Sequence, residues 1–262
     1  MKRILLILSI LTILLLLSSC SSMYIPAVRS IPLLDKKGEF QAEVGASTNS
    51  VYANTSYAIT DDIAVSLNGN LSYRNFTNFY DIFTPHIVDS DWFDSGEFAH
   101  RYGEISVGKI NILSSPKIMK LEVFGGAGMG RATDYDNWYK SDYYSLFGQV
   151  NFGIKLRNIE DGLSMRLAYS GFDYTDRHYL GNNEYSTSQV NFNILHVEPM
   201  GCVRIGRGDL KVVLRGGINF AFTLNPKKEF AGHYGFDYVD GKVDCTIFHF
   251  SIGASYRLGG KK

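Results

Sequence analysis

Apolar and polar side chains alternate along most of this chain, and this alternation constrains the fold more than any other feature. The clearest run is 143–157, where the apolar face carries Tyr144, Leu146, Val150, Phe152, Ile154 and Leu156. The other face carries Ser145, Gln149, Asn151, Lys155 and Arg157, with Phe147 as an exception. Because successive side chains of a strand point to opposite faces, this spacing predicts a strand with one apolar and one polar face.

The same alternation predicts about ten strands, at 40–47, 51–59, 63–76, 100–110, 119–131, 143–157, 163–174, 188–204, 210–222 and 243–258. Within 188–204 the apolar face changes parity after Ile194, which predicts a β-bulge near Leu195. Short connections alternate with long ones at 77–99, 132–142, 175–187 and 223–242. Short turns at one end and long loops at the other are typical of outer-membrane barrels. We therefore expect an all-β fold: a closed antiparallel up-and-down β-barrel of eight to ten strands.

Alternation alone leaves open which face points outward. A soluble lipocalin-like barrel that binds a lipophilic ligand has the same period with its apolar face turned inward. Strand length favours the membrane form, since most of the predicted strands reach the ~9–11 residues that a tilted transmembrane strand needs. Aromatic residues near strand ends, such as Tyr143, Tyr174 and Tyr256, are typical of the interfacial girdles of membrane barrels.

Composition agrees with a β-rich membrane protein. The chain has 17 Tyr, 17 Phe and 26 Gly but only 6 Pro, a balance that favours strands. Lys and Arg together number 26, as do Asp and Glu, so the net charge of zero predicts no nucleic-acid partner. Beyond the first 20 residues, no run of 18 apolar residues occurs, so a membrane-spanning mature chain would have to be a barrel.

The N-terminus has the features of a secretory signal. Lys2 and Arg3 precede an apolar run, Ile4–Leu17, that is too short to span a bilayer as a helix. The sequence Leu17-Ser18-Ser19-Cys20 resembles the bacterial lipoprotein signal. This resemblance implies that Cys20 is lipidated and becomes the new N-terminus, and that the protein is sent to the outer membrane, since no Asp follows the cysteine.

The resemblance also sets the expected domain boundaries. Residues 1–19 are expected to be the signal peptide, 20–37 the lipidated N-terminus and a tether, and 38–262 the barrel domain. A lipid at Cys20 is expected to hold the N-terminus at the periplasmic leaflet, which agrees with an even number of strands.

The mature chain resembles the small outer-membrane β-barrel lipoproteins of Bacteroidetes-type bacteria. The local feature is Pro32 followed by Lys37-Gly38-Glu39 at the entry to the first predicted strand. The resemblance implies a location and a fold and no catalytic residues. The partners expected on this basis are outer-membrane lipid and the barrel-assembly and lipoprotein-sorting machinery.

Charged residues recur on the polar faces of the predicted strands. In a narrow barrel such side chains meet across the lumen, where unpaired charge is costly. We therefore expect a polar network of ion pairs that largely plugs the lumen. A small porin for polar solutes is the alternative. The residues are Arg74, Glu104, Glu122, Lys155, Arg166, Glu198, Arg215 and Arg257.

The loop 77–99 is the strongest candidate for an interaction surface. Its aromatic residues lie among acidic ones, a mixture that is typical of binding sites. Tyr80, Phe83, Trp92 and Phe93 are the candidates for contact with an extracellular partner.

Signals for catalysis are weak. Asp176-Arg177-His178 in a predicted loop gives an omptin-like rim hydrolase as an alternative, because a carboxylate-oriented His can activate water. Cys202 and Cys245 fall on predicted strands separated by another strand, too far apart for a disulfide. We expect a non-enzymatic protein with a structural or interaction role at the cell envelope, without a cofactor or metal ion.

Overall fold

The computed structural model describes residues 24, 27–47, 50–72, 99–111, 113, 118–133, 139–181, 184–224 and 248–259. The strands are β1 (Phe40–Ser47), β2 (Val51–Ala58), β3 (Ile63–Ser72), β4 (Ala99–Lys109), β5 (Met119–Thr133), β6 (Tyr139–Lys155), β7 (Ile159–Gly181), β8 (Glu184–Ile205), β9 (Leu210–Ile218), β10 (Phe220–Thr223) and β11 (Phe248–Leu258). Among these residues, no helix is long and apolar enough to cross a membrane.

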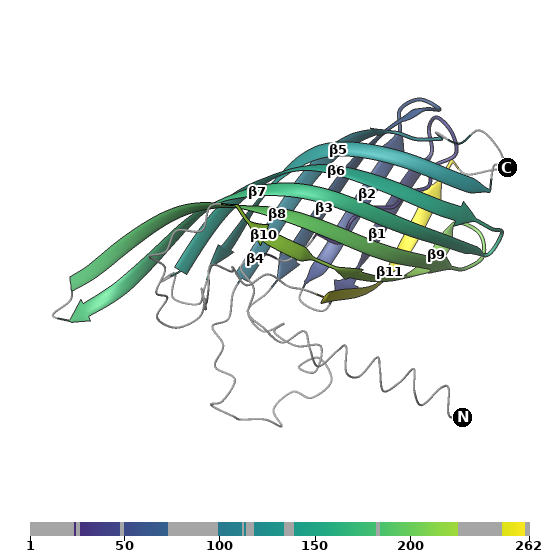
Figure 1. Cartoon of the computed structure of the whole chain (residues 1–262). Helices are drawn as coiled ribbons and strands as arrows, with labels where there is room; N and C mark the ends of the chain where they lie inside the picture. The colour runs from purple at the N-terminus through teal and green to yellow at the C-terminus, as the bar shows by residue number, and fades with distance from the viewer. Residues whose placement is uncertain are drawn as a thin grey trace, which may run out of the picture.

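The sheet closes on itself as an antiparallel barrel (Figure 1). Strands β1 to β8 pair in sequence order, β8 pairs with β9, and β11 joins β9 to β1. On β8, the partners Met200↔Gly217 and Val197↔Phe220 share one register. Strands β9 and β10 are therefore one barrel strand interrupted at Asn219, and the expectation of a closed ten-stranded barrel is confirmed.

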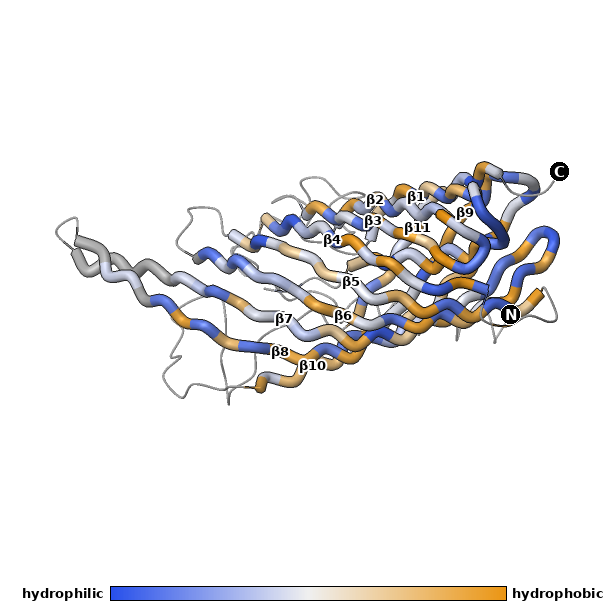
Figure 2. The backbone as a smooth tube through the Cα atoms, turned by 90° about the horizontal axis from the view of Figure 1, so that it is seen from above, coloured by the Kyte–Doolittle hydropathy of each residue, from blue (hydrophilic) through white to orange (hydrophobic). Residues whose placement is uncertain are grey.

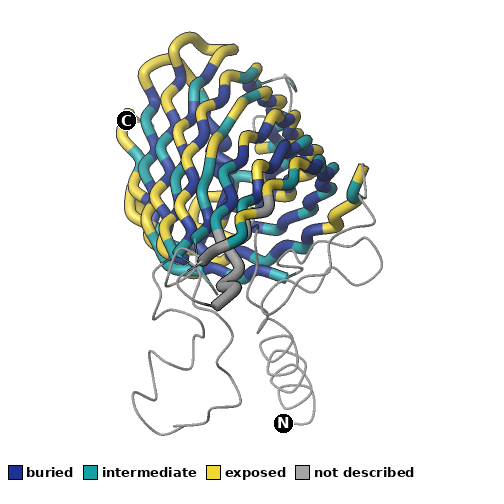
Figure 3. The backbone as a smooth tube through the Cα atoms, turned by 90° about the vertical axis from the view of Figure 1, so that its left-hand side faces the viewer, coloured by how far each residue is buried: buried dark blue, intermediate teal, exposed yellow. Residues whose placement is uncertain are grey.

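Hydrophobic and hydrophilic residues alternate along the strands of the barrel wall (Figure 2), and so do exposed and buried residues (Figure 3). Leu146, Leu163 and Ile252 face outward with 54%, 64% and 51% of their surface exposed. Polar side chains such as Glu104 and Gln149 face inward and are buried. An apolar outer belt suits lipid, so the fold is that of an outer-membrane β-barrel. The alternative of a soluble lipocalin-like barrel, which requires the apolar face to point inward, is therefore wrong.

The predicted β-bulge near Leu195 is absent from the described part of β8. The register between β7 and β8 is constant from Ile159↔Ile205 to Tyr179↔Tyr185 and shifts only beyond Tyr179. Phe192 and Ile194 face inward, where they belong to a cluster of buried aromatic side chains. Apolar packing inside the lumen explains the change of pattern without a change of register.

Strands β7 and β8 are longer than the sequence predicted. The predicted loop 175–187 is mostly strand, with pairs such as Asp176↔Ser188 and His178↔Ser186. This hairpin projects beyond the neighbouring strands (Figure 1). Ladder hydrogen bonds satisfy the backbone whatever the polarity of the side chains, so the hairpin continues past the apolar belt.

A stretch before the first strand fills the interior of the barrel. Residues 27–34, called here the lumenal segment, are all buried, with Arg29, Ile31, Leu33 and Leu34 at 0% exposure. The sequence predicted a tether at 20–37, but this part of it lies inside the lumen. The segment is rich in apolar side chains, and these pack against the inner wall instead of extending into water.

Candidate functional site in the barrel lumen

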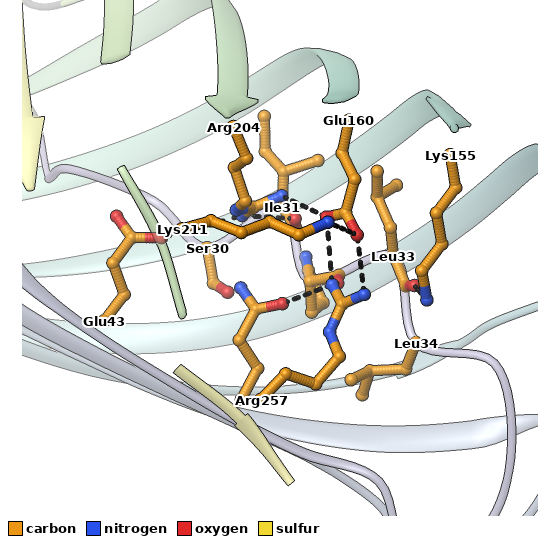
Figure 4. Close-up of polar contacts among 12 residues, drawn as sticks. Ser30, Ile31, Leu33, Leu34, Glu43, Lys155, Glu160, Arg204, Lys211 and Arg257 are labelled. Carbon is orange, nitrogen blue, oxygen red and sulfur yellow. Dashed lines mark hydrogen bonds and ion pairs between the residues drawn. The ribbon is translucent and has the colours of Figure 1, made fainter. Parts of the chain in front are cut away.

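Side chains from the barrel wall hold the backbone of the lumenal segment. Five carbonyl groups of the segment accept hydrogen bonds from polar side chains on β2, β6, β8 and β11. Figure 4 shows Arg204 beside Ile31 and Lys155 beside Leu33. Asn54 donates to Val28 O (2.6 Å), Gln149 to Ser30 O (2.9 Å), Arg204 to Ile31 O (2.7 Å), Arg257 to Pro32 O (2.8 Å) and Lys155 to Leu33 O (3.3 Å). The donors come from opposite sides of the barrel, so the segment lies across the lumen and not along one wall.

The wall also has glycines where the side chains of the segment pack against it. A Cβ atom at Gly153 would lie 2.5 Å from both terminal carbons of Leu33, and one at Gly162 would lie 3.0 Å from Cγ2 of Ile31. The two glycines are register partners on β6 and β7. On neighbouring strands, Met200, Cys202 and Val213 complete an apolar cluster around Ile31 and Leu33. The inner wall is therefore shaped to fit these two side chains.

An ion-pair network surrounds Arg29, near the start of the lumenal segment. Arg166 donates from Nη2 to Glu104 Oε2 at 2.6 Å and from Nη1 to Glu104 Oε1 at 3.2 Å. Glu198 lies 3.7 Å from Nε of Arg166 and 3.6 Å from Nη1 of Arg29. The side chains of all these residues are fully buried. Arg29 of the segment supplies the second positive charge against two carboxylates.

A second network surrounds Glu160 (Figure 4). Its carboxylate accepts from Lys211 at 2.6 Å and from Arg257 at 2.8 Å, and lies 3.7 Å from Arg204. Nearby, Arg215 donates from Nη2 to Glu43 at 2.6 Å. Several bases around each buried carboxylate offset the desolvation that burial costs.

Asp35 closes the end of the lumen near the short turns. Its carboxylate pairs with Lys120 at 2.9 Å and Lys155 at 2.5 Å. Partial burial alone would raise the pKa of Asp35, but Lys155 and Lys120 outweigh it and lower the pKa to about 2. Asp35, which directly follows the lumenal segment, therefore supplies the anion that neutralises two wall lysines at this end.

Aromatic side chains close the other end of the described lumen. Tyr24 stacks on His196 with ring centroids 4.1 Å apart and donates from its hydroxyl to Glu198 at 3.0 Å. Its ring meets Tyr143 edge-on at 5.8 Å. Tyr143 and Tyr174 are buried in this cluster, so they are not part of an outer girdle, although Tyr256 does face outward.

Seven of the eight predicted lumen residues lie on the inner side of the wall, and Arg74 lies outside the described residues. Arg166 joins Glu104 and Glu198, while Lys155 and Arg257 lie around the segment. Glu122 accepts from Asn151 at 3.2 Å and from the backbone N–H of Leu34 at 3.1 Å instead of pairing with a base. Arg215 pairs with Glu43.

The alternation along the sequence predicted neither the lumenal segment nor the buried positions of Arg29 and Glu160. One signal was available: Ala27-Val28, Ile31 and Leu33-Leu34 are too apolar for a solvated linker. The inward positions of Gly153 and Gly162 would have added weight, but a sequence does not show which segment they face.

Several other predicted residues lie outside the described part of the chain: Cys20, Tyr80, Phe83, Trp92, Phe93 and Cys245. Cys202 is buried and forms no disulfide within the described residues. Asp176 and His178 belong to β7 by their backbone, but their side chains are not described. Over the described ranges, no group of three or more His, Cys, Asp or Glu side chains could hold a metal ion.

No protein-family model and no curated protein matches this chain. Among solved structures, the chain is similar to the N-terminal β-barrel domain of OprF from Pseudomonas aeruginosa, with 9% identity, a TM-score of 0.33 and coverage of 86% of this chain and 100% of that one. It is also similar to the outer-membrane protein OmpT of Vibrio cholerae, with 10% identity, a TM-score of 0.23 and coverage of 86% and 100%. A major outer membrane protein from Thermus thermophilus has 12% identity, a TM-score of 0.25 and coverage of 84% and 98%. These values are too low to transfer a role to any residue.

Proposed function

We propose that this protein is a non-enzymatic outer-membrane β-barrel lipoprotein, of the type found in Bacteroidetes, with a structural or interaction role at the cell envelope. In this proposal Cys20 carries the lipid, and lipoprotein-sorting and barrel-assembly machinery deliver the chain. The loops that follow the longer strands would meet an extracellular partner. The apolar outer belt of the barrel supports the membrane location.

The observation that carries the proposal is the filled lumen. Wall side chains bind the carbonyls of the lumenal segment, and wall charges are balanced by Arg29 in the segment and by Asp35 directly after it. Removing the segment would leave Glu198 without Arg29 and the wall donors without the carbonyls that they bind. A lumen neutralised by the chain itself suits a closed barrel better than a pore for solutes.

Conductance in planar bilayers tests the closed lumen. The full mature chain is expected to give no channels, whereas a variant lacking residues 24–34 is expected to give discrete openings. Channels of equal size and frequency in both proteins would contradict the proposal and favour the small porin.

A point variant provides a matched comparison. Gly153→Phe places a ring where Leu33 lies, and is expected to displace the segment and open the channel. Gly148→Phe is the control on the same strand, because a Cβ at Gly148 points outward and meets nothing within 4 Å. The control is expected to stay closed. Openings in the control alone would show that the segment does not close the lumen.

A further inference from the structure

The direction of the lumenal segment is fixed at both ends. Asp35 lies at the short-turn end, where its carbonyl accepts from Asn111 at 3.0 Å and the N–H of Lys37 donates to Asp61 at 2.8 Å. Tyr24 lies beside Tyr143 and Phe172. These two residues are register partners, and Tyr143 lies four residues from the start of β6, at the opposite end of that strand from the short turn after Lys155. Going from Tyr24 to Asp35, the chain therefore runs from the long-loop end towards the short-turn end.

The distance between these ends is close to the thickness of a membrane. Tyr24 contacts Tyr143 of β6, and Asp35 contacts Lys155 of the same strand, which is 12 residues further on. Twelve steps of ~3.3 Å give ~40 Å along the strand. A strand tilt of ~40° reduces this to ~30 Å along the barrel axis, against an apolar band ~25 Å tall.

Chain length then restricts where Cys20 can lie. Only four residue steps separate Cys20 from Tyr24, and four extended residues reach at most ~14 Å. That reach is about half of the ~30 Å between the two ends. The lumen that leads back to the short turns is moreover filled by the lumenal segment. Whatever conformation residues 20–23 adopt, Cys20 cannot reach the short-turn end.

The barrel wall is low at β1 and β2, beside Val28 of the lumenal segment. Strands β1 and β2 have only eight residues each. The carbonyl of Val28 is held by Asn54, four residues from Ser50 at the end of that hairpin. On this side only a short wall separates the lumenal segment from the surrounding lipid.

We propose that the lipidated N-terminus emerges at the outer face of the membrane, so that the chain passes through its own barrel and the acyl chains of Cys20 enter the outer leaflet. The inference rests on the lipidation of Cys20 in the proposed function and reverses its expected side. For a barrel that already spans the membrane, a periplasmic lipid would only repeat the anchoring that the wall provides. An outer-leaflet lipid instead fixes the upper end of the lumenal segment and prevents its withdrawal towards the periplasm.

Cysteine labelling in whole cells tests the side of the membrane. In a Cys245→Ser background, Ser22→Cys is expected to react with a membrane-impermeant maleimide on intact cells. Lys36→Cys, which is exposed beside the short turns, is the matched control. It is expected to react only after the outer membrane is permeabilised. Reaction of Ser22→Cys only after permeabilisation, together with Lys36→Cys, would overturn the inference.

A second measurement separates this inference from the function on which it rests. Incorporation of an alkyne-labelled fatty acid is expected in the wild type and not in Cys20→Ala. Equal absence of label in both would refute the lipoprotein assignment itself. Incorporation at Cys20 with labelling of Ser22→Cys only after permeabilisation would leave a lipoprotein and refute only its outward-facing N-terminus.

Discussion

Breaking the buried pair between Arg166 and Glu104 is expected to destabilise the barrel strongly. Both side chains have 0% exposure, and the guanidinium carbon of Arg166 lies 3.6 Å from the centroid of the Phe147 ring. Arg166→Met leaves the Glu104 carboxylate without its base in a dry site. Removing one partner of a buried pair costs about 3–5 kcal/mol. The loss should appear in the free energy of unfolding.

The double variant shows whether the loss comes from uncompensated charge. Glu104→Gln/Arg166→Met removes both charges, and keeps an acceptor for Asn68, which donates to Glu104 at 2.7 Å. The double variant is expected to recover most of the loss, so that the coupling energy in a double-mutant cycle is about 2 kcal/mol or more. The single variant Glu104→Gln completes the cycle.

Urea unfolding of the protein in lipid vesicles provides the measurement. The folded fraction can be followed by the different gel mobility of folded and unfolded barrels without heating. A loss below about 1 kcal/mol for Arg166→Met would match a solvent-exposed pair. That result would refute the reasoning, because it would mean that water fills the lumen around Arg166.

Three further predictions follow from the geometry. The pKa of Asp35 in the folded protein is about 2, which is below its value in the unfolded chain. The ionised carboxylate therefore stabilises the fold by about 1 kcal/mol after solvent screening, and this contribution is present above about pH 4 and lost as the pH falls towards 2. Asp35→Asn should remove this part of the pH dependence of the free energy of unfolding. Leu146→Cys is expected to react with a lipid-soluble maleimide and Ser145→Cys to stay unreactive, since Leu146 is 54% exposed on the outer face and Ser145 is fully buried; the reverse pattern would contradict the orientation of the wall. In a Cys245→Ser background, Cys202 should react with maleimide only after unfolding, because it is 3% exposed; rapid reaction of the folded protein would indicate an open lumen.

Period-two alternation was enough to predict the barrel, because a strand exposes its two faces to different surroundings and each face needs matching side chains. It located Leu146 and Ile154 on one face and Gln149 and Asn151 on the other, as found. At Phe192 and Ile194 the alternation led to a wrong prediction, a β-bulge that the register of β8 does not contain. These apolar residues face inward because their neighbours there are apolar, and a local pattern cannot distinguish that from a shift of register.

The contents of the lumen needed the tertiary structure. Ile31 and Leu33 lie more than 115 positions before Gly153 and Gly162, so nothing local relates them. The pairing of Arg29 with Glu198 spans a separation of 169 residues. The sequence by itself determined the strands, the two faces of the wall and the presence of buried charge. Only the closed barrel decided which segment fills it and in which direction, because closure brings distant side chains around one axis.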